Sequence, residues 1–301
     1  MEYHVSPLIK SLEPGVQTKP MLDDPYAFVN NLEPLTRHDY SYILKKIEQG
    51  WITDRDIEIV KFIFVHRWVT LSQISRIFFP ETNREGTVRN RVQKLLKYGL
   101  IRKIEWTSYS NPKENKPILY ELGASGADIL KLRYGAFLGH RDPRMPKPIT
   151  MLFRMKYITI NEFFIQLREC FVVNHFEFHP ILTIKEDQQI PSAKFTLKNP
   201  NNVDMSFYLI CHRDDEKWLK TIRFQAQFYK EYFNTVEKDT LLVIVVSTSD
   251  KAELASKILD QEGILKRTWF VTDDDLYNNQ ISMTQGFFTY IDGRKLYYDL
   301  K

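Results

Sequence analysis

The stretch EGTVRNRVQKLLKYGLIRKIEW, Glu85 to Trp106, is the most informative part of the first half of this chain. Its apolar residues recur at the i, i+4, i+7, i+8 spacing of a helix that buries one face. These residues are Val88, Val92, Leu95 and Leu96. Gly99 suits the left-handed residue that ends a helix, and LIRKIEWTSY then alternates as a strand. The stretch therefore predicts a helix that turns at Gly99 and runs into a strand.

The opposite side of this helix is polar and basic. At about 100° per residue, one face collects Thr87, Asn90, Arg91, Lys94 and Lys97. Residues 84–116 contain nine Lys and Arg against three Asp and Glu, an excess of +6 in a chain whose net charge is +4. Such a local excess attracts polyanions. The alternative interpretation is a solvated basic face without a partner.

The neighbouring segments place this helix third in a series. TDRDIEIVKFIFVHRWV predicts a first helix capped by Thr53 or Asp54, and TLSQISRIFF a second capped by Thr70. After the third helix, LIRKIEWTSY and KPILYELG form a hairpin around the polar turn SNPKEN, and ASGADILKLRYG closes the unit as a helix. This order is typical of a winged helix-turn-helix, which we assign to residues 54–138.

In a winged helix-turn-helix, the third helix enters the major groove of DNA. We therefore expect its polar face to meet base edges, since Asn and Arg make bidentate contacts with adenine and guanine. The predicted base-edge residues are Thr87, Asn90, Arg91 and Lys94. The predicted phosphate contacts are Arg84, Arg89, Lys97, Lys113 and Lys116. Winged helices also serve as protein–protein modules, and this alternative stays open.

The remaining chain divides into three further parts. Residues 1–53 are predicted to form a proline- and glycine-punctuated arm followed by the helix RHDYSYILKKIEQG. Residues 139–150, GHRDPRMPKPIT, have the composition of a linker. Residues 151–301 alternate strands and helices and include TLLVIVVSTS, a run suited to a strand buried on both faces. They predict a mixed α/β domain. The expected fold class of the whole chain is therefore α+β or α/β, with a winged helix-turn-helix followed by this mixed domain.

Several function classes receive little support. No run of about 18 apolar residues suits a membrane-spanning helix, and MEYHVSPLIKSLEPG lacks the zones of a signal peptide. Cys170 and Cys211 make neither a disulfide framework nor a zinc cluster. No glycine-rich phosphate loop is present among only 11 glycines. We expect a cytoplasmic protein without a cofactor or a membrane partner.

Two acidic clusters, CHRDDE and the DDD of Asp273–Asp275, invite a search for a nuclease. Metal-dependent nucleases of αβ shape carry acids on two adjacent strands, where they hold magnesium. Here those positions are occupied by Ser192, Ile210 and His212. We interpret Asp273–Asp275 as a solvated loop and expect no enzyme. The alternative is a nuclease with a non-standard site.

That alternative site would use acids close to the same two strands. The candidates are Asp204, Asp214 and Glu216. The last two lie in the sequence just before a predicted helix, together with Asp215, and such acids more often cap the helix N-terminus.

The layout DRDIEIVKFIFVHRWVTLSQISRIFF…TVRNRVQKLLKYGLIRKI…ILYELGASGADIL resembles the plasmid replication-relaxation family of Gram-positive bacteria. The resemblance covers about residues 53 to 260 and includes a "Y.L...G...L" pattern. This pattern falls on Tyr120, Leu122, Gly126 and Leu130. The resemblance implies a DNA-binding accessory or regulatory protein that acts in plasmid or mobile-element replication, transfer or transcription control.

The resemblance also implies a second half similar to the restriction-endonuclease fold, with "PD" on one strand and "E.D" on the next. Pro191 fits this pattern, but Ser192, Ile210 and His212 depart from it. The second half is therefore expected to be a degenerate, non-catalytic version that dimerises or binds a partner.

The expected partners are double-stranded DNA, a second copy of the chain, and other plasmid replication or transfer proteins. The helix KWLKTIRFQAQFYKEYF carries large apolar residues at helical spacing that form either the core or a dimer seam. These are Trp218, Phe224, Phe228 and Tyr232.

Overall fold

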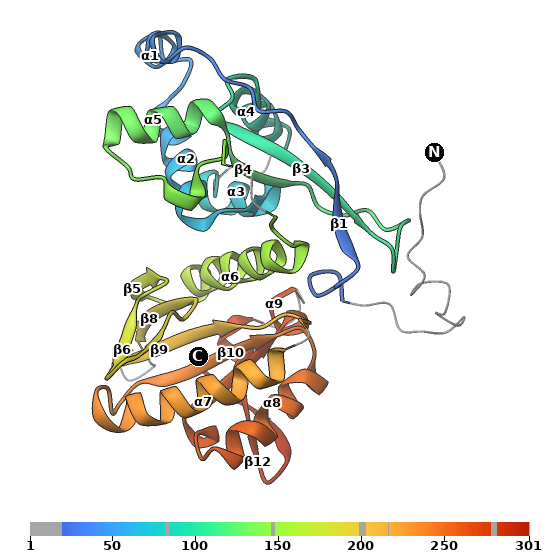
Figure 1. The fold of residues 1–301 in the computed structure, drawn as a ribbon, viewed down its shortest axis with the longest axis vertical. Helices are drawn as coiled ribbons and strands as arrows, with labels where there is room; N and C mark the ends of the chain where they lie inside the picture. Colours follow the sequence, from blue (N-terminus) through green and yellow to red (C-terminus); the bar gives the residue numbers. More distant parts are fainter. Residues whose placement is uncertain are drawn as a thin grey trace. The chain divides into compact units, whose positions relative to one another are not determined.

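The structure is a computed structural model that describes residues 20–81, 85–145, 148–198, 203–215, 217–277 and 282–300. The architecture is mixed α+β, and the chain forms two compact units, residues 1–161 and 162–301 (Figure 1). We refer to them as unit 1 and unit 2. The division falls inside helix α6 (Met151–Cys170), eleven residues beyond residue 151, where the sequence predicts the start of the second domain.

Unit 1 is built from helices around a small antiparallel sheet. Its helices are α1 (Tyr40–Glu48), α2 (Asp54–His66), α3 (Leu71–Phe78), α4 (Glu85–Lys97) and α5 (Ala124–Tyr134), with the short 3-10 turn η1 (Gly139–Arg141) and the first part of α6. Its strands are β1 (Ala27–Leu32), β2 (Val69–Thr70), β3 (Ile101–Ser108) and β4 (Leu119–Leu122), in the order β1-β3-β4-β2. The predicted order of three helices, a hairpin and a closing helix is confirmed.

Local signals explain where these helices begin and end. Thr53 precedes α2, and its backbone N–H donates to the carboxylate of Asp56 at 2.7 Å. Thr70 precedes α3, and its hydroxyl accepts from the backbone N–H of Gln73 at 3.3 Å. Both are N-cap arrangements that satisfy exposed backbone groups in the first turn. Gly99 has a φ of +64° and ends α4 in the left-handed conformation that the sequence predicts.

The apolar face of α4 lies in the core of unit 1. Val88, Val92, Leu95 and Leu96 are all buried and belong to one hydrophobic cluster with residues of α2 and α5. The polar face therefore remains on the surface, because a helix with a single apolar stripe buries only that side.

The N-terminal segment contributes more than an arm and a helix. Strand β1 pairs antiparallel with β3, with Phe28 opposite Thr107, and lies beside it along the sheet (Figure 1). Asp24, just before β1, accepts hydrogen bonds from the hydroxyls of Ser108 and Ser110 at the far end of β3. The hairpin is therefore held on its β3 side by residues from the start of the chain.

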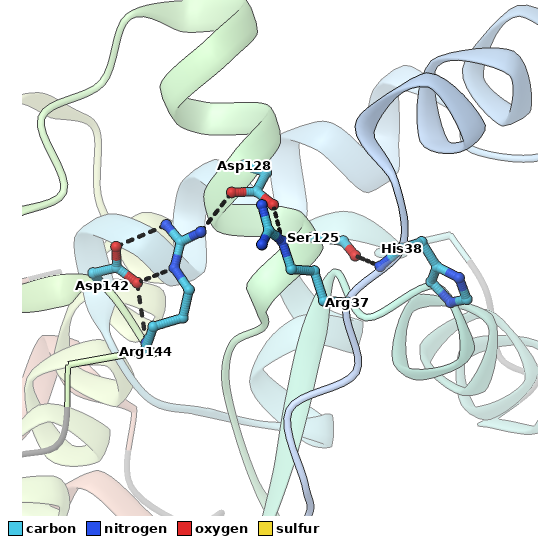
Figure 2. A network of polar contacts seen from close by, with 6 residues as sticks. All are labelled: Arg37, His38, Ser125, Asp128, Asp142 and Arg144. Atoms are coloured by element: carbon cyan, nitrogen blue, oxygen red, sulfur yellow. Dashed lines mark hydrogen bonds and ion pairs between the residues drawn. The ribbon is translucent and has the colours of Figure 1, made fainter.

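The described residues of the predicted linker, 139–145 and 148–150, are tied to unit 1. Arg144 forms ion pairs with Asp142 and with Asp128 of α5, at 2.7 Å each, and Arg37 approaches the same Asp128 at 2.8 Å (Figure 2). Arg141 donates to the backbone oxygen of Phe64 at 3.1 Å. These contacts fasten the segment to α5 and to the end of α2.

Unit 2 contains a seven-stranded mixed sheet in the order β13-β12-β11-β10-β9-β8-β5. The strands are β5 (Val173–Phe178), β8 (Ala193–Lys198), β9 (Asp204–Cys211), β10 (Leu241–Val246), β11 (Thr268–Thr272), β12 (Phe288–Ile291) and β13 (Arg294–Tyr297), beside a separate hairpin of β6 (Leu182–Ile184) and β7 (Asp187–Gln189). β9, β10 and β11 run parallel, and β10 is buried along most of its length as its sequence predicts.

Helices cover both faces of this sheet. α7 (Trp218–Thr235) and α8 (Ser249–Gln261) share one hydrophobic cluster with the sheet, and both run along it in Figure 1. From the second part of α6, Phe163 contacts Phe195 of β8 at a ring distance of 5.5 Å. On α7, Trp218, Phe228 and Tyr232 are buried, which confirms the core interpretation for these three, whereas Phe224 is 54% exposed.

The interpretation of Asp273–Asp275 as a solvated loop is wrong. These residues begin helix α9 (Asp273–Tyr277), and the side chains of Asp273 and Asp275 are buried. Asp273 forms a bidentate ion pair with Arg213, with both N–O distances at 2.9 Å. Asp275 accepts from the backbone and hydroxyl of Thr272 at 2.9 and 2.6 Å. The acids are buried because each has a donor that neutralises or satisfies it.

Candidate nucleic-acid interface

The polar face of α4 lines a groove in unit 1 with a cavity volume of about 670 Å³. All four predicted base-edge residues take part in it, together with the first residues of α2 and the end of α3. The lining residues are Thr53, Asp54, Arg55, Phe79, Thr87, Asn90, Arg91 and Lys94, and we call this site the α4 groove. Thr87, Asn90 and Lys94 are exposed, so their polar atoms face solvent from one side of one helix.

Arg91 has a different environment from its three neighbours. Its Nε donates to Oδ1 of Asp56 at 2.6 Å, its Nη2 pairs with the other oxygen of that carboxylate, and Nη2 also reaches Oγ1 of Thr53 at 2.9 Å. The side chain of Arg91 is 20% exposed and that of Asp56 only 1%. The guanidinium therefore holds α4 against the N-terminus of α2, and this contact between residues 35 positions apart left no local pattern in the sequence.

Sequence reasoning missed the opposite wall of the groove. Arg55 lines it from α2, with its guanidinium carbon 4.9 Å from the ring centre of Phe79. Trp51 lies beside the groove, 52% exposed, with Nζ of Lys94 5.8 Å from the centre of its ring. The signal in the sequence that could have revealed this wall is Trp51, a large aromatic residue in the turn WITD next to the helix cap Thr53. An analysis of helical periodicity passes over turn residues.

The predicted phosphate residues are spread over unit 1. Lys97 is exposed at the end of α4, and Lys113 is exposed between β3 and β4. Arg89 is exposed as well and lies near Tyr120, where its positive charge opposes the rise that burial causes in the pKa of the phenol. Arg84 lies outside the described residues.

Lys116 does not share this exposure. Its side chain is only 3% exposed, its amine pairs with Glu114, and the amine lies 5.4 Å from the centre of the Trp106 ring. The face of the ring attracts the ammonium group, and the carboxylate neutralises its charge. A side chain in this position presents little positive charge to an outside phosphate.

The charges of the α4 groove favour an anionic partner. Lys94, Arg55 and Arg91 contribute three cations and Asp54 one carboxylate, and Asp56 neutralises Arg91. Lys94 and Arg55 thus outnumber Asp54 on the accessible lining. Exposed amide and hydroxyl groups lie between these cations, an arrangement that can contact both the backbone and the bases of a nucleic acid.

The candidate nuclease acids of unit 2 are far from one another. Asp204 begins β9 and Asp214 follows its end, so the eight residues of that strand, at a rise of about 3.3 Å each, separate them. Asp204 accepts from Asn174 at 2.7 Å, and Asp214 pairs with Lys251 at 3.2 Å. Glu216 lies outside the described residues.

The three positions where a nuclease would carry acids are all buried. The backbone N–H of Ser192 donates to the oxygen of Leu209 at 2.7 Å, which places it beside the end of β9 near Ile210 and His212. Within the described ranges, no group of three or more His, Cys, Asp or Glu residues could hold a metal ion.

Comparison with known proteins gives one result. Residues 60–182 match the replication-relaxation family, which confirms the resemblance over that part of the chain and implies a role related to plasmid replication. The matched span runs from α2 to β6 and includes the whole of α4. No curated protein and no solved structure matches the chain. In the described part of the chain, no helix has the length and apolar character needed to cross a membrane.

Proposed function

With residues 60–182 matching the replication-relaxation family, we propose that the chain is a sequence-specific double-stranded DNA-binding protein. It acts in the replication, transfer or transcription control of a plasmid or mobile element. The observation that carries the proposal is the convergence of Thr87, Asn90 and Lys94, all exposed, in one groove along α4. The series α2, α3, α4, β3, β4 has the order of a winged helix-turn-helix, in which α4 is the recognition helix.

The groove residues take separate roles in this proposal. Asn90 reads an adenine through its amide, Thr87 contacts a neighbouring base, and Lys94 approaches a guanine edge or a phosphate. Arg91 is a positioning residue, because its guanidinium already binds Asp56. Lys97, Arg89 and Lys113 neutralise flanking phosphates and make the affinity depend on salt.

Charge reversal at Lys94 tests the proposal directly. Lys94→Glu should weaken binding to duplex DNA by about tenfold or more, since a carboxylate in the groove repels phosphates. It should also make the slope of log affinity against log salt concentration less steep, by the amount expected for the loss of roughly one to two phosphate contacts. Fluorescence anisotropy of a labelled duplex, titrated at several salt concentrations, measures both quantities.

Lys220→Glu is the matched control. Lys220 is exposed on α7 in unit 2, so its reversal changes the net charge equally and leaves the α4 groove intact. An equal loss of affinity in both variants would mean that only the total charge matters. Unchanged affinity in Lys94→Glu would show that duplex DNA does not use this groove and would favour a protein partner.

For unit 2 we propose a non-catalytic role in dimerisation or partner binding. The separation of Asp204 from Asp214 along β9 supports this, as do the buried, uncharged side chains of Ser192 and Ile210. Incubation of plasmid DNA with the full chain and magnesium or manganese should leave it intact. Cleavage that Asp214→Ala abolishes would contradict the proposal.

A further inference from the structure

A second cavity in unit 1 shares no lining residue with the α4 groove and has a volume of about 420 Å³. It is the more cationic of the two. Five arginines line it, namely Arg67, Arg102, Arg141, Arg144 and Arg154, and we call it the arginine pocket. The carboxylates on the same lining are Glu121 and Asp142. Leu32, Leu35 and Met145 add apolar surface.

Two of the arginines are neutralised by those carboxylates. Arg102 donates from Nε to Glu121 at 2.8 Å, and its Nη2 pairs with the same oxygen. Arg144 lies between Asp142 and Asp128 and binds both (Figure 2). Both carboxylates of the lining are therefore already paired with an arginine.

The other three arginines have no carboxylate partner among the residues that the structure describes. Arg154 is 8% exposed, and its Nη1 donates to the backbone oxygen of Ile149 at 2.5 Å. Its Nε is buried and has no hydrogen-bond partner in the described ranges, and the same is true of Nε of Arg67. Arg141 donates to the backbone oxygen of Phe64 at 3.1 Å and lies over the ring of the same residue. A buried cation without a counter-ion is costly, so an anion here would offset that cost.

Trp68 lies beside two of these three cations. The guanidinium carbons of Arg67 and Arg154 lie 5.7 and 5.4 Å from the ring centre of Trp68. The indole N–H donates to Glu121 at 2.8 Å and so fixes the ring. Burial lowers the pKa of both Arg141 and Arg154. The charge of Arg67 adds to the effect on Arg141, while at Arg154 the charge of Glu121 opposes the effect of burial and that of Arg102 adds to it. Arg67 and Arg141 are therefore close enough to repel each other.

The backbone at Arg67 supports a functional role. Its φ is +63°, in a region that residues with a side chain rarely adopt. Such conformations are energetically costly and are concentrated at functional sites. Here the unusual backbone follows directly on the end of α2 and places the guanidinium of Arg67 on the pocket lining.

We propose that the arginine pocket binds a small phosphorylated molecule through Arg67, Arg141 and Arg154. The planar fork of a guanidinium matches phosphate oxygens, and three such groups suit a multiply charged phosphate better than a single carboxylate. The volume lies within the ~300–1,000 Å³ of small-molecule sites. The apolar lining leaves room for the part of the ligand that carries no charge.

The test is isothermal titration calorimetry on the full chain with three probes: inorganic pyrophosphate, ATP and adenosine. We expect saturable one-to-one binding of ATP or pyrophosphate and none of adenosine. Arg67→Gln and Arg141→Gln should each weaken the binding by about tenfold or more, as expected for the loss of a charge-assisted hydrogen bond. Arg133→Gln, which removes an exposed arginine of α5 outside the pocket, should leave it unchanged.

Each outcome decides the proposal. Equal binding of pyrophosphate and ATP would identify the phosphate chain as the recognised group, and preference for ATP would add recognition of the nucleoside. The proposal is overturned if neither probe binds saturably, or if Arg67→Gln and Arg141→Gln bind as the natural chain does. It is also overturned if these variants lose affinity for duplex DNA while the natural chain ignores both phosphate probes. Arg154→Lys, which keeps the buried charge, checks that any loss follows from the guanidinium rather than from misfolding.

Discussion

Replacing Arg91 by alanine is expected to lower the free energy of unfolding by about 3 kcal/mol, the scale for breaking a buried ion pair on one side. The carboxylate of Asp56 is 1% exposed and would lose its only cationic partner among the described residues. It would keep the hydrogen bonds from the backbone and hydroxyl of Thr53, which do not neutralise its charge. The result would show that Arg91 fixes α4 on α2.

Urea denaturation measures this effect, and Lys94→Ala serves as its control. Lys94 is exposed on the same helix and should change the unfolding free energy by less than about 0.5 kcal/mol. If Arg91→Ala is as stable as Lys94→Ala, the contact with Asp56 is not a structural one. If Arg91→Ala also relaxes one position of a DNA site without loss of stability, Arg91 reads a base as the sequence predicts.

Gly99→Ala should destabilise unit 1 by about 3 kcal/mol or more, from two causes that add. The residue has a φ of +64°, which costs a side chain about 1–2 kcal/mol. A Cβ would also stand 2.2 Å from the backbone oxygen of Thr36. Because that atom belongs to the backbone, it cannot move aside as a flexible side chain would. Thr36 is itself held, since the next residues bind Asp128 and Ser125 (Figure 2).

Gly135→Ala separates the two causes. Gly135 ends α5 with a φ of +66°, and a Cβ there would meet nothing within 4 Å. It should therefore cost only the conformational part, about 1–2 kcal/mol. Urea denaturation gives the free energy of unfolding of each variant, and the difference between the two variants measures the cost of the contact with Thr36. Equal destabilisation would mean that the N-terminal segment does not lie against Gly99.

Local patterns in the sequence predict much of unit 1. The stripe from Val88 to Leu96 is buried, Thr70 caps α3, and Gly99 ends α4, because each depends on residues a few positions apart. Thr87, Asn90 and Lys94 follow from the same periodicity, since the face opposite a buried stripe is exposed.

Contacts between distant residues account for what the sequence does not predict. The guanidinium of Arg91 suits a contact with a base edge, but in the structure it binds the carboxylate of Asp56. The positive charge of Lys116 suits a phosphate contact, but its amine pairs with Glu114 and lies 5.4 Å from the centre of the Trp106 ring. Asp273 belongs to an acidic run typical of a solvated loop, and Arg213, sixty residues earlier, allows it to be buried. Strand β1 likewise depends on pairing with β3, which no local pattern encodes.

Selection from a pool of random duplexes by the full chain at physiological salt, for the natural chain and for Asn90→Ala, tests sequence reading by α4 most directly. The natural chain should enrich one sequence, as an inverted repeat if it binds as a dimer. Asn90→Ala should lose about 1–3 kcal/mol of preference at one base pair of that sequence while the rest persists. Enrichment of no sequence, or an unchanged preference at every position in Asn90→Ala, would contradict the account.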